Sequence, residues 1–235
     1  MEPFRAFAHL LVEAVFPVHC VSCGAWGEWW CFACRNAVTI LRKRICPRCA
    51  SVKTEHICGG GGALDALCAA GFYHDPILRS VIHALKYRGA TEAAPSIGQF
   101  LHAWRDAMLE PWPWAGESHI AIQPLPSSPA RIRARGFDQS ACLARIVRDE
   151  LIPWADPADL LRRSRNGDPQ SSLPHGPMRE ANIQGAFACR PGTVPQAILL
   201  IDDVVTSGAS FREAARILKK AGVSRVYGLA LAVGA

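Results

Sequence analysis

Residues 197–210 read AILLIDDVVTSGAS, and this stretch decides the fold of the chain. Its first five residues are continuously apolar, which is typical of a strand buried on both faces of a parallel sheet. Two aspartates follow, then small hydroxylated residues around a glycine, then an apolar-periodic run over residues 211–221. Backbone N–H groups and the helix dipole favour negative charge at a helix N-terminus, so this order of strand, acids, loop and helix predicts a phosphate-binding loop.

The acidic pair Asp202 and Asp203 indicates which kind of phosphate compound the loop binds. Carboxylates repel a triphosphate unless a metal ion intervenes, but they accept hydrogen bonds well from the vicinal hydroxyls of a sugar. The sequence contains neither a G-x-x-x-x-G-K-[ST] P-loop nor a G-x-G-x-x-G dinucleotide fingerprint. We therefore expect a ribose 5-phosphate here; the structural alternative is a strand that ends in a polar turn and a helix cap.

Length and composition limit the domain organisation. The 235 residues, half of them hydrophobic, are enough for one globular domain with a small additional unit, or for two modest domains. The net charge of +6 allows a polyanionic partner without requiring one. Residues 1–16 are predicted to form an amphipathic helix that is too short to cross a membrane, and they do not read as a signal peptide, so we expect a cytoplasmic protein without membrane insertion.

The cysteines indicate a metal-binding unit over residues 17–62. Of ten cysteines, seven lie within residues 20–58, and six of these form three C-x-x-C pairs, which favours metal in a reducing compartment over disulfides. The two pairs Cys20/Cys23 and Cys31/Cys34 predict a closed tetrahedral zinc site, and the alternative is free buried cysteines. A unit with so little apolar material depends on metal for folding.

A second zinc site is suggested by Cys46, Cys49 and Cys58. The expected fourth cysteine would lie near position 61, where the sequence has glycine. Either His56 completes a Cys3His set or the second site is vestigial, so one or two zinc ions are expected.

Residues 63–235 alternate strand-like and helix-like stretches, which predicts an α/β domain with a central parallel sheet. Strands are expected over residues 67–73, 119–123, 159–163, 197–201 and 223–233, and helices over residues 32–41, 76–87, 91–109 (capped by Thr91), 137–151 and 211–221. Trp104, Trp112 and Trp114 are either core residues or an exposed aromatic surface, and ordinary packing is expected for most of them. Residues 164–184 lack periodicity and are predicted to form a mobile hood opposite the phosphate site.

A cationic patch is predicted after the strand at residues 119–123. Three prolines indicate a loop there, and Arg131, Arg133 and Arg135 follow at alternate positions. Guanidinium groups pair bidentately with diphosphate oxygens, although the same cluster could hold a nucleic-acid backbone or be a solvated basic loop.

Over residues 197–210 the sequence closely resembles the phosphoribosyl-diphosphate (PRPP) motif of type I phosphoribosyltransferases. The resemblance implies that the acidic pair holds the ribose hydroxyls and that the loop holds the 5-phosphate. The PRPP-binding residues beyond the acids would be Val204, Val205, Thr206, Ser207, Gly208, Ala209, Ser210, Arg131 and Arg133.

Nearly the whole chain resembles the ComF family, in which an N-terminal zinc unit precedes a type I phosphoribosyltransferase-like domain. The motifs that carry the resemblance are the cysteine pairs, LKYRG at 85–89, RARGFDQS at 133–140, Gln170, Leu173, Arg179, Asn182, Ala186 and Phe187. The chain departs from the family at the missing cysteine near Gly61 and at Asp138, where the family usually has asparagine.

The resemblance implies a phosphoribosyl transfer from PRPP, with Mg²⁺, to an unidentified acceptor, as part of DNA uptake in natural transformation. Asp202, Asp203, Lys86 and Arg135 would be the catalytic residues, with Asp203 the first choice for a general base. The alternative is a non-catalytic accessory protein that binds single-stranded DNA through the zinc unit and the arginines, works with the DNA-uptake machinery and uses the fold as a scaffold or PRPP sensor. A transcriptional regulator is less favoured, because no helix-turn-helix is apparent. Neither acceptor nor oligomeric state is indicated.

Overall fold

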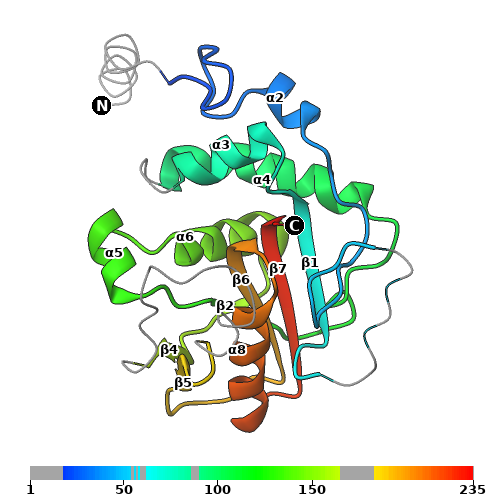
Figure 1. Ribbon diagram of the computed structural model, residues 1–235, viewed down its shortest axis with the longest axis vertical. Coiled ribbons are helices and arrows are strands. Elements are labelled where there is room, and N and C mark those ends of the chain that lie inside the picture. The colour runs from blue at the N-terminus through cyan, green and yellow to red at the C-terminus, as the bar shows by residue number, and fades with distance from the viewer. Residues whose placement is uncertain are drawn as a thin grey trace.

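A five-stranded parallel sheet, with strand order β1-β7-β6-β2-β3, forms the centre of the protein (Figure 1). The structure is a computed structural model, and it describes residues 18–53, 56, 58, 62–85, 90–164 and 183–234. The strands of this sheet are β1 (Ala66–Phe72), β2 (Ala121–Pro124), β3 (Asp156–Pro157), β6 (Ala197–Val205) and β7 (Arg225–Val233). The predicted α/β class with a central parallel sheet is confirmed, and it is consistent with a phosphoribosyltransferase-like fold.

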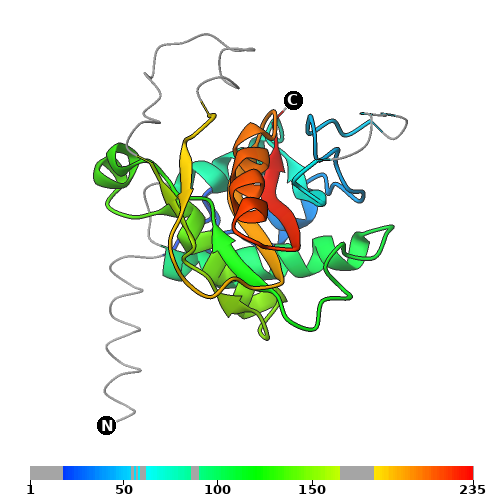
Figure 2. The same ribbon diagram turned by 90° about the horizontal axis from the view of Figure 1, so that it is seen from below.

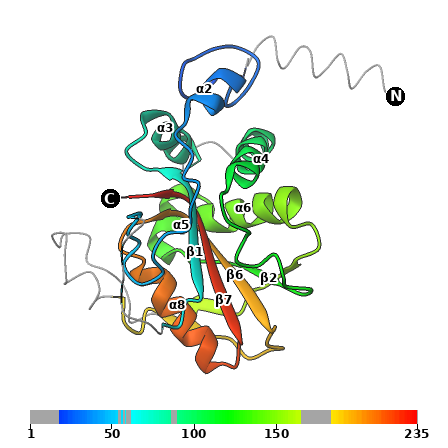
Figure 3. The ribbon, with the colours of Figure 1, turned by 90° about the vertical axis from the view of Figure 1, so that its right-hand side faces the viewer.

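Helices cover both faces of this sheet (Figure 3). Those packed on the sheet include α3 (Pro76–Ala84), α4 (Ala90–Ala107), α6 (Gln139–Ile146) with a π-helical turn η1 (Val147–Leu151), and α8 (Ala209–Lys220). The described residues also form α2 (Phe32–Ala37), which lies on the far side of α3 (Figure 1), and α5 (Pro129–Arg135). On β6, Leu199 and Ile201 belong to the apolar cluster formed with α3, α4 and α6, whereas Ile198 and Leu200 belong to the cluster formed with α8. Both faces of β6 are therefore buried, which explains its unbroken apolar run.

A two-stranded antiparallel sheet, β4 (Leu161–Arg163) with β5 (Phe187–Cys189), lies to one side of α8, where Figure 2 draws it in yellow. The backbone N–H of Gly185 donates to a Glu213 carboxylate oxygen at 2.8 Å, which ties this sheet to α8.

The cysteine-rich segment crosses the outer side of β1. Below α2 the chain runs down beside β1 (Figures 1 and 3), where Leu41 N–H donates to Ala70 O and Ile45 N–H donates to Leu67 O, both at 3.0 Å. The indole N–H of Trp104 donates to the Leu41 carbonyl at 3.1 Å. The cysteine-rich segment and the sheet thus share backbone hydrogen bonds, while the proposed division at residues 62/63 stays a prediction.

The predicted packing of the tryptophans is confirmed. Trp104 and Trp114 are buried, and Trp112 stacks on Trp104 with ring centroids 6.2 Å apart.

Several predicted boundaries were wrong. The strand β6 does not stop at Ile201 but continues through both aspartates to Val205, because β7 keeps pairing with it up to that residue. Helix α8 begins at Ala209, two residues earlier than predicted, and α4 begins at Ala90, so Thr91 is not its cap. The helix after Cys31 ends at Ala37 instead of residue 41, where the chain turns to run along β1.

The arginine stretch was predicted as a loop, and this was wrong. Residues Pro129–Arg135 form the helix α5, and Pro129 suits its first position, since a first-turn residue needs no N–H partner. In a helix, positions 131 and 135 lie on one face and position 133 lies on another. The alternate spacing therefore does not put the three positions on one side, as it would in an extended segment.

Some predicted features lie outside the described residues. These are the helix over residues 1–16, the residues Lys86 to Gly89, and the hood residues 165–182; of Arg131 the backbone is described and the side chain is not. Among the helices of the described part, none is long and apolar enough to cross a membrane.

Candidate functional site

The acidic pair lies at the carboxyl end of β6, the edge of a parallel sheet where ligands bind in open α/β folds. Both side chains are half-buried. The Asp202 carboxylate accepts a hydrogen bond from the Ser140 hydroxyl at 2.7 Å and one from the Asp203 backbone N–H at 3.0 Å. The Asp203 carboxylate accepts from Val204 N–H at 2.8 Å. Backbone and helix α6 thus fix the orientation of both acids.

Asp202 holds its proton more tightly than an ordinary aspartate. Burial, and then the neighbouring Asp203 charge, raise the pKa of Asp202 to about 8, although the Ser140 hydrogen bond opposes this. Ionising both adjacent carboxylates is unfavourable because their charges repel each other, and a bound cation would offset this repulsion. The chemistry of this pair fits a divalent ion with oxygen ligands.

The loop after β6 has the backbone of an anion site. Gly208 is the N-cap residue of α8, with φ 73°, a conformation that glycine adopts without strain. Because this N-cap is a glycine, it contributes no side chain to the N–H groups of the first helical turn. These groups face the same end of the sheet as Asp203, as expected for a phosphate site. Thr206 is exposed, and Ser207 and Ser210 are half-buried, so their hydroxyls remain accessible.

The arginine helix reaches the acidic pair indirectly. Arg135 donates to the side-chain oxygen of Gln139 at 3.0 Å, and Gln139 is buried and donates to Ile82 O at 3.1 Å. The next residue, Ser140, is the one that holds Asp202. Arg135 therefore contacts the chain neighbour of Ser140, the residue that binds Asp202. Arg133, in contrast, is exposed.

Asp138, the position at which the family usually has asparagine, is the N-cap of α6. Its carboxylate accepts from Ser140 N–H at 3.1 Å and from the Ser127 hydroxyl at 3.0 Å. Aspartate and asparagine are about equally good N-caps, so this departure leaves the local structure intact.

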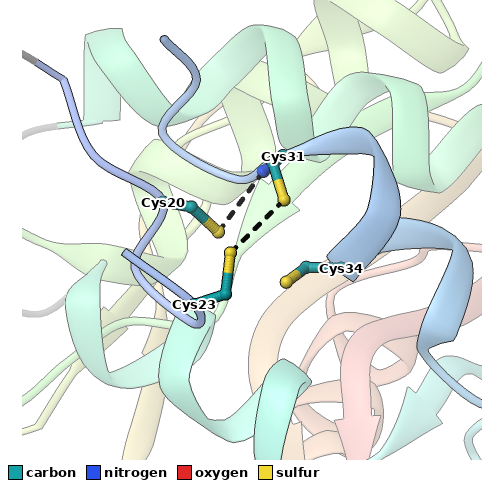
Figure 4. Close-up of side chains that lie close together, drawn as sticks. All are labelled: Cys20, Cys23, Cys31 and Cys34. Atoms are coloured by element: carbon teal, nitrogen blue, oxygen red, sulfur yellow. Dashed lines mark hydrogen bonds between the residues drawn. The ribbon is translucent and has the colours of Figure 1, made fainter. Parts of the chain in front are cut away.

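The first cysteine cluster converges as predicted (Figure 4). The sulfur atoms of Cys20, Cys23, Cys31 and Cys34 all lie within 4.8 Å of one another. Cys23 and Cys31 have sulfurs 3.6 Å apart, close to the ~3.8 Å that tetrahedral Zn–S bonds of about 2.3 Å require. Burial raises the pKa of Cys34 to about 12. Burial acts in the same direction on Cys20, but backbone N–H donors to its sulfur outweigh it and lower the pKa of Cys20 to about 6. Four crowded thiols of this kind fit a zinc ion.

The second cluster contains His56 in place of the missing cysteine. One ligand atom from each of Cys46, Cys49, His56 and Cys58 lies within 4.8 Å of the others. His56 Nε2 is 3.0 Å from the Cys49 sulfur and 2.9 Å from the Cys58 sulfur. Of the two sequence alternatives, the Cys3His set is the one that this arrangement fits. Both clusters could therefore hold zinc.

Sequence reasoning missed two residues that shape this site. Ser140 binds Asp202 from 62 positions away in the chain, and Arg212 joins the loop between β6 and α8 to the second cysteine cluster. Ser140 was recognised only as part of a family motif, and Arg212 reads as an ordinary polar position of an amphipathic helix.

Curated relatives match most of the chain. DNA utilization protein YhgH of Escherichia coli K12 is 28% identical over 217 residues, covering 88% of this chain and 90% of that protein. Competence protein F of Haemophilus influenzae is 26% identical over 230 residues, covering 86% of this chain and 96% of that protein. Competence protein ComFC of Bacillus subtilis is 23% identical over 202 residues, with 82% and 78% covered. No family model matches the chain. These relatives, which are named as competence and DNA utilization proteins and match most of the chain, confirm the resemblance inferred from the motifs.

Proposed function

We propose that this ComF homologue binds PRPP with Mg²⁺ at residues 202–210 and transfers the phosphoribosyl group to an acceptor. One observation carries the proposal: two oriented carboxylates end a buried parallel strand and are followed at once by a glycine-capped helix N-terminus. This arrangement supports a ligand that carries vicinal hydroxyls and a phosphate on one sugar. The protein would then be a glycosyltransferase of the phosphoribosyltransferase class.

The reaction breaks the bond between C1 of the ribose and the diphosphate oxygen, and forms a bond from C1 to the acceptor's nucleophile. Bound Mg²⁺ would neutralise charge on the departing diphosphate. Asp202 and Asp203 orient the ribose hydroxyls, and Asp203, which lies next to the loop, is positioned to take the acceptor's proton. Arg135 and Lys86 assist the diphosphate by charge, with Arg131 and Arg133 as further contacts.

Turnover tests this proposal. Zinc-loaded protein incubated with PRPP and Mg²⁺ should release diphosphate, measured by a coupled phosphate assay across a panel of candidate acceptors. Asp202→Asn and Asp203→Asn should abolish release, whereas Asp106→Asn, an exposed acid at the end of α4, should not. A folded, zinc-loaded protein that binds PRPP but releases no diphosphate with any acceptor would disprove the transfer and leave a sensor.

The names of the relatives support a place in DNA utilization or competence, which we propose for this chain together with a cytoplasmic location and contact with DNA-uptake proteins.

A second candidate function is single-stranded DNA binding. Trp26 and Phe32, on the first cysteine cluster, are 75% and 67% exposed, and exposed rings of this kind stack on bases. The arginines of α5 would hold the phosphates.

Fluorescence anisotropy with a labelled single-stranded oligodeoxythymidine at several salt concentrations tests DNA binding. Trp26→Ala should weaken binding, and Arg131→Ala/Arg133→Ala/Arg135→Ala should also reduce the salt dependence. Trp154→Ala is the matched control, because Trp154 is 61% exposed but lies away from the cysteine clusters. Equal affinity of the arginine variant and the parent would remove α5 from the contact surface.

A further inference from the structure

The second cysteine cluster lies against the start of α8. Its knuckle turn, residues 46–50, ends at Ala50, which is buried and belongs to the same apolar cluster as Val205 and Phe211. A Cβ placed on Gly208 would lie 3.9 Å from Ala50 Cβ. The knuckle therefore packs at Gly208 against the loop between β6 and α8, residues 206–208, which is called the phosphate loop below.

Arg212 connects the two structures through hydrogen bonds. From the first turn of α8, its guanidinium Nη1 donates to the Ser207 carbonyl in the phosphate loop at 2.6 Å. The same nitrogen donates to the Arg48 carbonyl, which lies between Cys46 and Cys49. A single planar group thus holds a loop carbonyl and a knuckle carbonyl at once.

We propose that metal binding at Cys46, Cys49, His56 and Cys58 sets the conformation of the phosphate loop through Arg212, so that this cluster regulates ligand binding at the loop. Arg212 is then a positioning residue of the site. The effect on ligand binding rests on the proposed PRPP function, whereas the effect on loop order does not.

The physical basis is that a bound metal would fix the two cysteines on either side of the Arg48 carbonyl. Arg48 and Cys49 are exposed, so the tip of the knuckle buries little apolar surface. Within the knuckle, Ala50 N–H donates to Cys46 O at 2.8 Å and Cys46 N–H donates to Ser51 O at 2.9 Å. The Cys46 sulfur also accepts from the backbone N–H groups of Arg48 and Cys49. Bonds from one metal ion to Cys46 and Cys49 would add to these hydrogen bonds and hold the turn more rigidly.

The first cluster provides a contrast within the same chain. Cys20 and Cys34 are buried with Trp29 and Trp30 in the apolar cluster that holds α3 and α4, not in the one that holds α8. Losing metal there should lower stability without acting on the phosphate loop. Cys23 and Cys49 are both exposed members of a C-x-x-C pair, one in each cluster, and so they make a matched pair of variants.

The experiment compares Cys49→Ser, Cys23→Ser, Arg212→Ala and the parent protein under reducing conditions. Metal per chain is measured by mass spectrometry, folding by circular dichroism, affinity for ribose 5-phosphate by calorimetry, and loop order by hydrogen exchange of residues 205–212. We expect Cys49→Ser to lose one metal ion, weaken ribose 5-phosphate binding by about tenfold and speed exchange in the loop.

Arg212→Ala should have the same effect on affinity and exchange while its metal content stays that of the parent. Arg212→Lys should restore part of the affinity, because both bonds of Arg212 come from one nitrogen and a lysine ammonium also carries several donors on one nitrogen. Cys23→Ser should lose one metal ion without faster exchange in the loop.

The outcomes separate this inference from the proposed function. A parent protein that does not bind ribose 5-phosphate contradicts the proposed function, and hydrogen exchange then still decides the inference. Unchanged loop exchange in folded Cys49→Ser, or equal loop exchange in Cys49→Ser and Cys23→Ser, overturns the inference.

Discussion

The hydrogen bond from Ser140 to Asp202 makes a quantitative prediction about pH. The bond is 2.7 Å long and joins a hydroxyl to a carboxylate, so it favours the ionised form of Asp202. A hydrogen bond to a charged group contributes about 1.5–3 kcal/mol, which corresponds to about one to two pKa units. Ser140→Ala should therefore raise the pKa of Asp202, already about 8, by about one unit or more.

The sign of the functional effect follows from competition between a proton and a cation. Below its pKa, Asp202 is protonated and binds a divalent ion poorly, so Mg²⁺-dependent PRPP affinity should rise as pH increases through the pKa of Asp202. In Ser140→Ala this rise should move to higher pH, with affinity converging on that of the parent at the alkaline end.

Calorimetry of PRPP with Mg²⁺ across pH 6 to 10, a range of roughly two units either side of the pKa, measures the midpoint. Ser127→Ala is the control, since Ser127 lies at the same helix junction but donates to Asp138, from its hydroxyl at 3.0 Å and from its backbone N–H at 3.4 Å. A midpoint in Ser140→Ala equal to that of the parent would refute the reasoning, as would an equal shift in Ser127→Ala.

Three further predictions concern stability. The pKa of Asp202 is raised in the folded state, so on raising the pH the unfolded chain loses this proton first, and the free energy of unfolding should fall between about pH 4 and pH 8. Asp202→Asn should remove that fall and stabilise the ligand-free protein at pH 8 by at least about 1 kcal/mol, as measured by urea unfolding. Gly208→Ala should cost about 1 kcal/mol through its positive φ, with added strain from an Arg212 nitrogen 3.3 Å from the new Cβ, and Gly116→Ala, with open space around it, is the control in thermal melts. Cys34→Ser should abolish one zinc site and lower the melting temperature more than Cys189→Ser, which contributes to neither cluster; equal melting temperatures would argue against a structural zinc.

Local patterns in the sequence predicted the parts of the site that are contiguous. The stretch over residues 197–210 showed strand, acids and loop in order, because a buried parallel strand and a helix start are both encoded by neighbouring residues. The C-x-x-C pairs predicted their clusters for the same reason, since two cysteines of one knuckle turn converge without help from the rest of the fold.

The features that the sequence did not predict depend on distant parts of the chain. Ser140 and Asp202 are 62 positions apart, and Arg212 and Arg48 are 164 positions apart, so only the folded structure brings each pair together. The arginine helix was misread because prolines usually break regular structure, although Pro129 stands at the helix start, where proline is favoured. The boundary error at β6 arose because pairing with β7 extends the strand beyond its apolar run.

The chain segment beside β1 carries a consequence for association between molecules. β1 is an outer strand of the sheet, and the backbone of residues 39–46 occupies hydrogen-bonding groups that would otherwise be open to another chain. In sequence the two cysteine clusters flank this segment, and zinc bound in both would hold it in place. Zinc depletion is therefore expected to uncover the strand and to produce aggregation, so that the supply of metal controls how much protein stays monodisperse as well as how much is folded.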